Sequence, residues 1–63
     1  MINEDLIGKK YLFRYEDKEL IGVVDVIHED GNSILMFVEG ENINTPDEIY
    51  LIEKSSLIVE ILD

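Results

Sequence analysis

Residues 20–38, LIGVVDVIHEDGNSILMFV, carry the pattern that decides the fold. Two runs rich in β-branched residues, which suit a pleated sheet, flank the Asp-Gly pair at residues 30–31. Asp-Gly between apolar runs predicts a β-hairpin with a two-residue type I′ loop, because both central residues of that turn need a positive φ. Such a loop would place Val26 opposite Leu35 and Val24 opposite Phe37 in the ladder.

Both faces of this hairpin are apolar. Asp25 interrupts one of them, and a central unpaired carboxylate is costly to bury. We therefore expect the face without Asp25 to form the core, with Gly22 marking a bend or a close backbone approach. Ile34 and Met36 on the other face then form either a contact patch or a partly buried surface of a sharply bent strand. The residues of the expected core face are Leu20, Gly22, Val24, Val26, Leu35 and Phe37.

Three further strands are predicted on either side of the hairpin. Residues 9–16 alternate between two faces, and residues 49–53 and 57–62 are short apolar runs. Residues 54–56 are too few for an α-helix and predict a 3₁₀ turn. Residues 39–48 predict an acidic loop that contains a glycine and a proline. The sequence therefore predicts one all-β domain over its whole length.

Five short strands with a 3₁₀ turn between the fourth and the fifth resemble the layout of the SH3-like small barrels. The resemblance covers roughly residues 7–62 and implies a five-stranded SH3-like barrel. Within that class the chain is similar to Tudor-like domains. The positions that carry this similarity are Gly8, Asp17, Gly22, Val24 and Phe37.

Tudor-like domains bind methylated lysine or arginine in an aromatic cage. Glu19 and Leu20 stand where that pattern has aromatic residues. Residues 39–42 read Glu-Gly-Glu-Asn where the pattern has Asp-Tyr-Gly-Asn. The resemblance therefore implies the fold without the cage.

The chain has 63 residues and no cysteine, so neither disulfides nor a cysteine-based zinc site can stabilise it. Its start, Met-Ile-Asn-Glu-Asp, lacks the basic and apolar regions of a signal peptide. No apolar run approaches the length of a membrane span. We expect a cytoplasmic protein that does not bind membranes.

Charge is distributed unevenly along the chain. Fifteen acids against five bases give a net charge of −10. Residues 1–18 are neutral overall, whereas residues 19–63 hold eleven acids and one base. Such a field repels nucleic acid and anionic lipid, and it attracts basic surfaces.

No group of residues predicts catalysis or a cofactor. His28 is the only histidine, and no nucleophile and base occur in a known arrangement. The acidic loop lacks the spacing of a calcium-binding EF-hand. Tyr11, Phe13 and Tyr15 share one strand face, which predicts core, a protein-binding surface or a platform for nucleic-acid bases. The negative charge argues against the last of these. We expect a protein that is not an enzyme and has no cofactor or metal.

The leading functional hypothesis is a small acidic protein that binds a basic surface of another protein. Its sharpest form is a DNA mimic, an inhibitor of phage or mobile-element type that occupies a nucleic-acid-binding groove without binding nucleic acid itself. Carboxylates on strands and tight turns hold their positions best, and those of the long loop come second. The predicted partner-binding residues are Asp25, Glu29, Asp30, Glu39, Glu41, Asp47, Glu48, Glu53 and Glu60.

The alternative hypothesis is an ordinary SH3-like protein–protein interaction module or assembly subunit that binds through apolar strand faces. Residues 57–62 are apolar on both faces except for Glu60. An exposed apolar edge strand favours pairing with another chain, so the sequence also predicts a homodimer.

Overall fold

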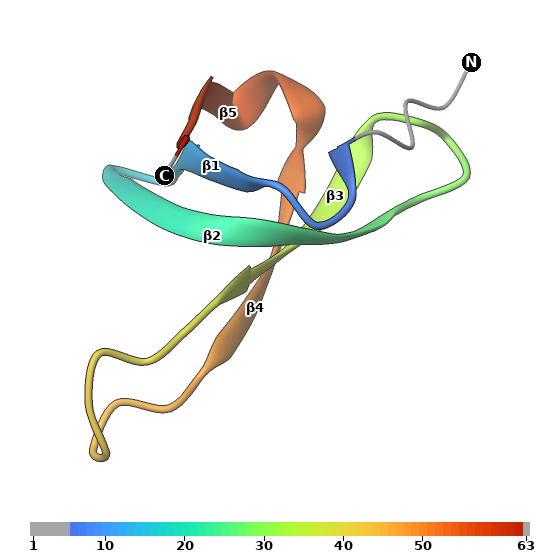
Figure 1. Cartoon of the computed structure of the whole chain (residues 1–63). Helices are drawn as coiled ribbons and strands as arrows, with labels where there is room; N and C mark the ends of the chain where they lie inside the picture. Colours follow the sequence, from blue (N-terminus) through green and yellow to red (C-terminus); the bar gives the residue numbers. More distant parts are fainter. Residues whose placement is uncertain (1–5, 63) are drawn as a thin grey trace.

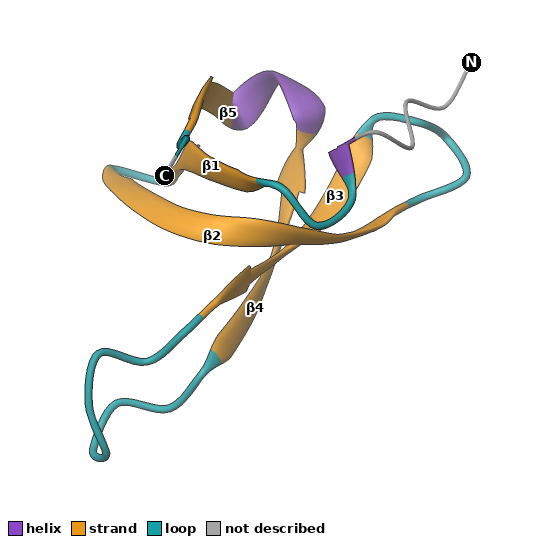
Figure 2. Cartoon of the chain, viewed as in Figure 1, coloured by secondary structure: helices purple, strands orange, loops and turns teal. Residues whose placement is uncertain are grey.

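The computed structural model describes residues 6–62. Strands alternate with turns, and a short 3₁₀ helix, Lys54–Ser56, follows the fourth strand (Figure 2). This confirms the predicted all-β class and the predicted 3₁₀ segment. The strands are β1 (Lys10–Tyr15), β2 (Lys18–Ile27), β3 (Ser33–Val38), β4 (Glu48–Glu53) and β5 (Leu57–Glu60).

All five strands form one antiparallel sheet in the order β4-β3-β2-β1-β5. The ten-residue β2 crosses the middle of the molecule, and the β3–β4 hairpin projects away from it (Figure 1). β4 pairs only with β3, and β5 pairs only with β1, within the described chain. Hydrogen bonds therefore leave the sheet open at these two edges and do not close it into a barrel.

A β-bulge at Asp25 divides β2 into two parts. Val24 pairs with Met36, whereas Val26 pairs with Leu35, so Asp25 is an extra residue without a partner in β3. Because side chains alternate along a strand, one extra residue changes which later positions face the core. The predicted pairing of Val26 with Leu35 is confirmed, whereas the predicted pairing of Val24 with Phe37 is wrong, because the extra residue at position 25 places Val24 opposite Met36.

The bulge overturns half of the predicted core face. Ile34 and Met36 are fully buried, whereas Phe37 and Val26 are exposed. Val24 is buried as predicted. The prediction assumed that side chains alternate without interruption through residue 25. It therefore assigned the wrong face of β3 to the core. The expectation that the Asp25 carboxylate lies in solvent is correct, because the bulge residue is exposed.

The turn between β2 and β3 also differs from the prediction. Gly31 has a φ of 74°, but Asp30 has no positive φ, so the turn is not type I′. The His28 N–H donates to the Ser33 carbonyl at 2.9 Å, and the Gly31 N–H donates to the His28 carbonyl at 2.9 Å. The Asp30 side chain is bonded to backbone N–H groups further on, as short acidic residues often are in turns.

The core lies on the inner face of the sheet. Phe13 is fully buried, with Tyr11 and Tyr15 packed against the core, so the aromatic stripe of β1 is core material. Tyr50 joins it from β4, with ring centroids 6.0 Å from Phe13 and 4.7 Å from Tyr15 in edge-on geometry. The buried residues are Leu6, Phe13, Val24, Ile34, Met36 and Ile52.

Gly22 lies where β2 approaches its neighbours most closely. A Cβ at this position would stand 2.7 Å from the Phe37 carbonyl oxygen and 3.2 Å from the Phe13 ring. A backbone oxygen cannot move aside as a flexible side chain can. The predicted close approach at Gly22 is confirmed, and it lets β2 and β3 pack over the Phe13 ring.

Candidate protein-binding surface

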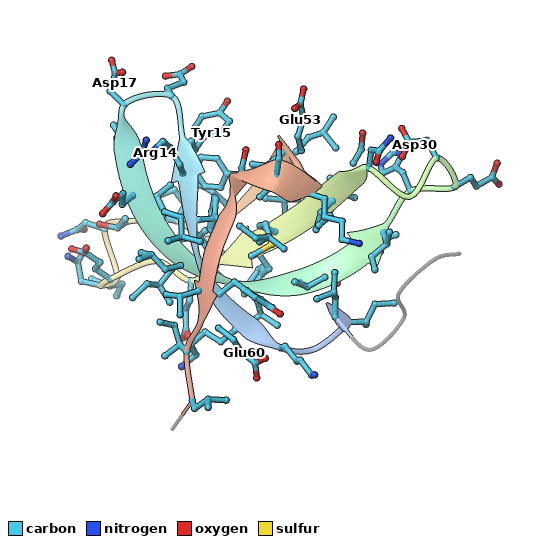
Figure 3. The ribbon with its side chains drawn as sticks, turned by 90° about the horizontal axis from the view of Figure 1, so that it is seen from above. Arg14, Tyr15, Asp17, Asp30, Glu53 and Glu60 are labelled. Carbon is cyan, nitrogen blue, oxygen red and sulfur yellow. The ribbon has the colours of Figure 1, made fainter. Side chains whose placement is uncertain are left out.

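The nine carboxylates predicted to bind a partner do not gather in one place. Asp30 and Glu53 lie on the same side of the molecule, whereas Glu60 lies well apart from both (Figure 3). Asp25 is on the β2 bulge, and the remaining acids occupy the β2–β3 turn or the β3–β4 loop and its margin. The structure therefore brings Asp30 near Glu53 but does not assemble the nine into one surface.

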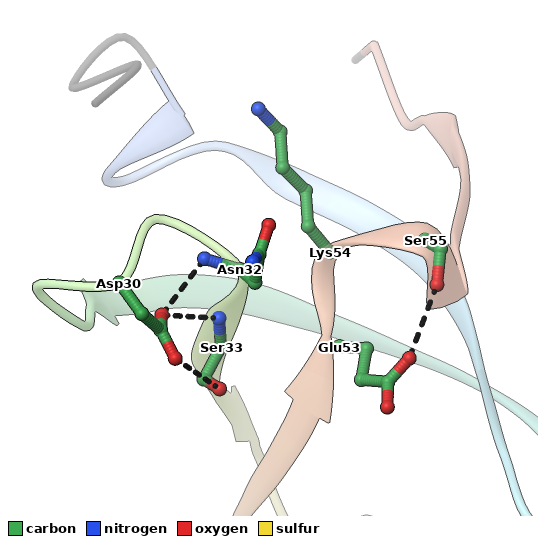
Figure 4. A pocket seen from close by; sticks show the side chains of 6 residues that line it. All are labelled: Asp30, Asn32, Ser33, Glu53, Lys54 and Ser55. Atoms are coloured by element: carbon green, nitrogen blue, oxygen red, sulfur yellow. Dashed lines mark hydrogen bonds between the residues drawn. The ribbon is translucent and has the colours of Figure 1, made fainter. Parts of the chain in front are cut away.

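Asp30 organises its own turn. Its carboxylate accepts the Asn32 N–H at 2.8 Å and the Ser33 N–H at 3.0 Å, and the Ser33 hydroxyl donates to it at 3.3 Å (Figure 4). The bonds from Asn32 and then Ser33 hold the pKa of Asp30 below its ordinary value. This carboxylate therefore has a structural role that sequence reasoning did not assign to it.

A shallow depression adjoins this turn, at the end of β4. The Ser55 hydroxyl lies 3.5 Å from a Glu53 carboxylate oxygen (Figure 4). The Lys54 N–H donates to the Asn32 carbonyl at 2.6 Å, and this bond joins the 3₁₀ helix to the β2–β3 turn. The residues that line the depression are Asp30, Asn32, Ser33, Glu53, Lys54 and Ser55.

Two more of the predicted acids bind within the β3–β4 hairpin. The Gly40 N–H donates to Asp47 Oδ1 at 2.8 Å, which closes the base of the loop. The Tyr50 hydroxyl donates to Glu48, and this bond raises the pKa of the Tyr50 phenol. Both acids thus hold the hairpin that carries them.

A second depression lies at the β1–β2 turn. It is lined by Arg14, Glu16, Asp17 and Glu19, and Arg14 pairs with Glu19 at 3.1 Å. Both side chains of the pair are exposed, so the pair contributes little to stability. Across residues 6–62 no three histidine, cysteine, aspartate or glutamate side chains are grouped as a metal site requires.

The outer face of the sheet carries an apolar patch. On the β2–β3–β4 side, the register aligns Val23 with Phe37 and Phe37 with Ile49. A second row aligns Leu35 with Val26 of β2 and with Leu51 of β4. The exposed fractions of the four most exposed members run from 36% to 57%. We name this set the outer patch, and it comprises Val23, Val26, Leu35, Phe37, Ile49 and Leu51.

Carboxylates border the outer patch at both ends. Beyond Leu35 and Leu51 the register places Glu53 beside Ser33. At the other end, beyond Phe37 and Ile49, the first residues outside the paired strands are Glu39 and Asp47. Lys10 lies opposite Val23 on the β1 side and is a basic neighbour of the patch. The surface is apolar in its middle and acidic at its two ends.

The chain matches no family model, no curated protein and no solved structure. No helix in the described part of the chain has both the length and the apolar character needed to span a membrane.

Sequence reasoning assigned five members of the outer patch to strands but not to a contact patch: Val26, Leu35, Phe37, Ile49 and Leu51. The available signal was that both faces of residues 20–38 are apolar, which is more than one small core can absorb. Locating the bulge would have assigned the two faces correctly.

Proposed function

We propose that the chain is a non-enzymatic SH3-like binding domain that contacts another protein through the outer patch. The observation that carries this proposal is the exposure of large apolar side chains in adjoining rows on β2, β3 and β4. Monomeric proteins rarely leave a contiguous apolar surface uncovered unless it binds something. The strand order, with a 3₁₀ helix between β4 and β5, supports the SH3-like class.

The partner that fits this surface is apolar in its middle and basic at its margins. Phe37, the one aromatic side chain of the patch, is suited to anchor such a contact, because aromatic residues dominate interface energetics. The acidic ends and the net charge of −10 attract a cationic partner and steer its approach. The alternative hypothesis from the sequence is thus the one that the geometry supports best.

A capture experiment with the tagged chain tests the proposal. The double variant Phe37→Lys with Leu51→Lys puts two charges into the outer patch. The matched control is the double variant Ile43→Lys with Leu62→Lys, which adds the same two charges at residues that are 98% and 81% exposed and outside the patch. We expect the parent and the control to retain the same proteins, and the Phe37→Lys, Leu51→Lys variant to retain at least tenfold less. Circular dichroism confirms that all three chains are folded.

Salt and nucleic acid distinguish this proposal from DNA mimicry. A contact centred on apolar side chains persists when salt screens the exposed charges, whereas a contact made by charges alone does not. Suppose instead that an oligonucleotide displaces the captured proteins while the Phe37→Lys, Leu51→Lys variant still captures them. Mimicry would then replace binding through the outer patch.

A further inference from the structure

β4 is an open edge without the usual protection. Natural sheets protect edge strands with bulges, proline, lysine or very short length. β5 has only four residues, and its pairing with β1 shifts register by one residue. β4 has six residues, Glu-Ile-Tyr-Leu-Ile-Glu, and its register with β3 is regular throughout. Of the two edges in the described chain, β4 is therefore the one open to a further strand.

The backbone of β4 presents a row of groups to this open edge. Directly after β4, the Lys54 N–H donates to the carbonyl of Asn32, the residue that precedes β3. Because hydrogen-bonded and non-bonded pairs alternate in an antiparallel ladder, the even-numbered residues of β4 bond to β3. The N–H and C=O groups of Ile49, Leu51 and Glu53 then point away from the sheet. No strand formed by residues 6–62 lies beyond them.

The same residues belong to the outer face. Ile49 and Leu51 are more than half exposed and are members of the outer patch. A strand added to β4 would place alternate side chains on that face and extend the patch by one column. Edge and patch thus form one continuous surface.

The charges at the ends of β4 indicate what kind of strand can be added to it. β4 begins and ends with a glutamate, Glu48 and Glu53, and Asp47 precedes it. A second copy of the chain would bring another net charge of −10 to this edge. A segment with lysine or arginine at its ends instead places opposite charges beside both glutamates.

We propose that β4 accepts an extended segment of a partner protein as a sixth strand, with alternate apolar side chains and basic ends. This inference rests on the proposed binding function and specifies how the partner is engaged. Main-chain bonds to Ile49, Leu51 and Glu53 hold the segment, and the outer patch selects its side chains.

The probe is the capped peptide Lys-Thr-Val-Thr-Val-Lys, whose antiparallel register puts its valines beside Leu51 and Ile49 and its lysines beside Glu53 and Glu48. In the control peptide glutamate replaces both lysines. We expect the basic peptide to bind at least tenfold more tightly than the acidic one. At saturation it should slow hydrogen exchange of the Ile49, Leu51 and Glu53 amides at least fivefold, measured by NMR. Peptide-induced shifts in the outer patch without protection of these amides would overturn strand addition.

Two variants at one position isolate the backbone contribution. Leu51→Pro removes an N–H that faces the open edge, whereas Leu51→Thr shortens the side chain and keeps that N–H. We expect the proline variant to bind the basic peptide at least tenfold more weakly than the threonine variant. Equal binding would refute the proposal. If the proline variant does not fold, amide exchange in the parent decides.

Two further outcomes separate this inference from its alternatives. Protection of the same amides at high protein concentration without peptide, with a dimer in sedimentation, would identify a second copy as the occupant and overturn the proposal. If the peptide fails while capture from a lysate still depends on Phe37 and Leu51, strand addition is wrong and binding through the outer patch stands.

Discussion

Asp30 shows how a single carboxylate can determine the shape of a turn. Its two oxygens accept two backbone N–H groups and one hydroxyl, all from the next three residues. The Asp-Gly pair still allows the chain to reverse, since Gly31 supplies the positive φ. Asp30 itself acts through its side chain and needs no unusual backbone geometry.

The stabilisation from Asp30 should depend on pH. Its folded-state pKa lies below the ordinary value of 3.8, so the carboxylate stabilises the fold at neutral pH. That contribution is fully present above the unfolded pKa and is lost as pH falls through the lowered folded pKa. We expect the loss of stability in Asp30→Ala, measured by urea denaturation, to be constant from pH 7 to about pH 5 and to shrink at lower pH.

Glu29→Ala is the matched control, because it removes a neighbouring carboxylate that makes none of these three bonds. A stability difference for Asp30→Ala that persists unchanged at pH 2.5 would show that the ionised form is not what closes the turn.

At the scale of the element, β3 separates two roles along one strand. Ile34 and Met36 point into the core, and Leu35 and Phe37 point outward into the outer patch. Neighbouring residues of one short strand therefore contribute separately to the core and to the proposed binding surface.

Substitutions at adjacent positions of β3 should show this separation. Met36→Ala leaves a cavity in the core and should lower the free energy of unfolding by about 2–5 kcal/mol. Phe37→Ala removes a larger side chain but from the outer face, and should cost about 1 kcal/mol or less, the scale of cross-strand pairs. Urea denaturation of both variants measures the two values. A Phe37→Ala cost as large as that of Met36→Ala would place Phe37 in the core after all.

At the scale of the whole molecule, the sequence predicts the number, order and type of elements well. β-branched runs, turn residues and the short segment 54–56 report local preferences, and each is found where predicted. The inner and outer faces were less predictable, because they depend on a bulge that no local preference marks. The outer patch was missed for the same reason, because assigning Phe37 to the core removed it from the candidate binding residues.

The net charge of −10 also acts on the molecule as a whole. Fifteen acids on so small a fold repel one another over distances comparable to its 39 × 25 × 17 Å extents. Salt shortens the reach of that repulsion from about 30 Å at 0.01 M to about 3 Å at 1 M. We expect the melting temperature at pH 7 to rise between these concentrations of sodium chloride, as calorimetry would measure. A fall would mean that attractive pairs such as Arg14–Glu19 outweigh the repulsion.

The bulge at Asp25 has a consequence for how this chain tolerates changes in length. Val24 points inward, Val26 outward and Ile27 inward again. The inward–outward alternation of β2 is therefore regular when Asp25 is left out. Deleting Asp25 would leave the pairs of Val24 with Met36 and of Val26 with Leu35 intact, whereas deleting Val24 would put the Asp25 carboxylate into the buried position opposite Met36. A one-residue deletion far from the bulge would exchange the inward and outward faces of part of β2, whereas a deletion at Asp25 would remove only the bulge and its bend.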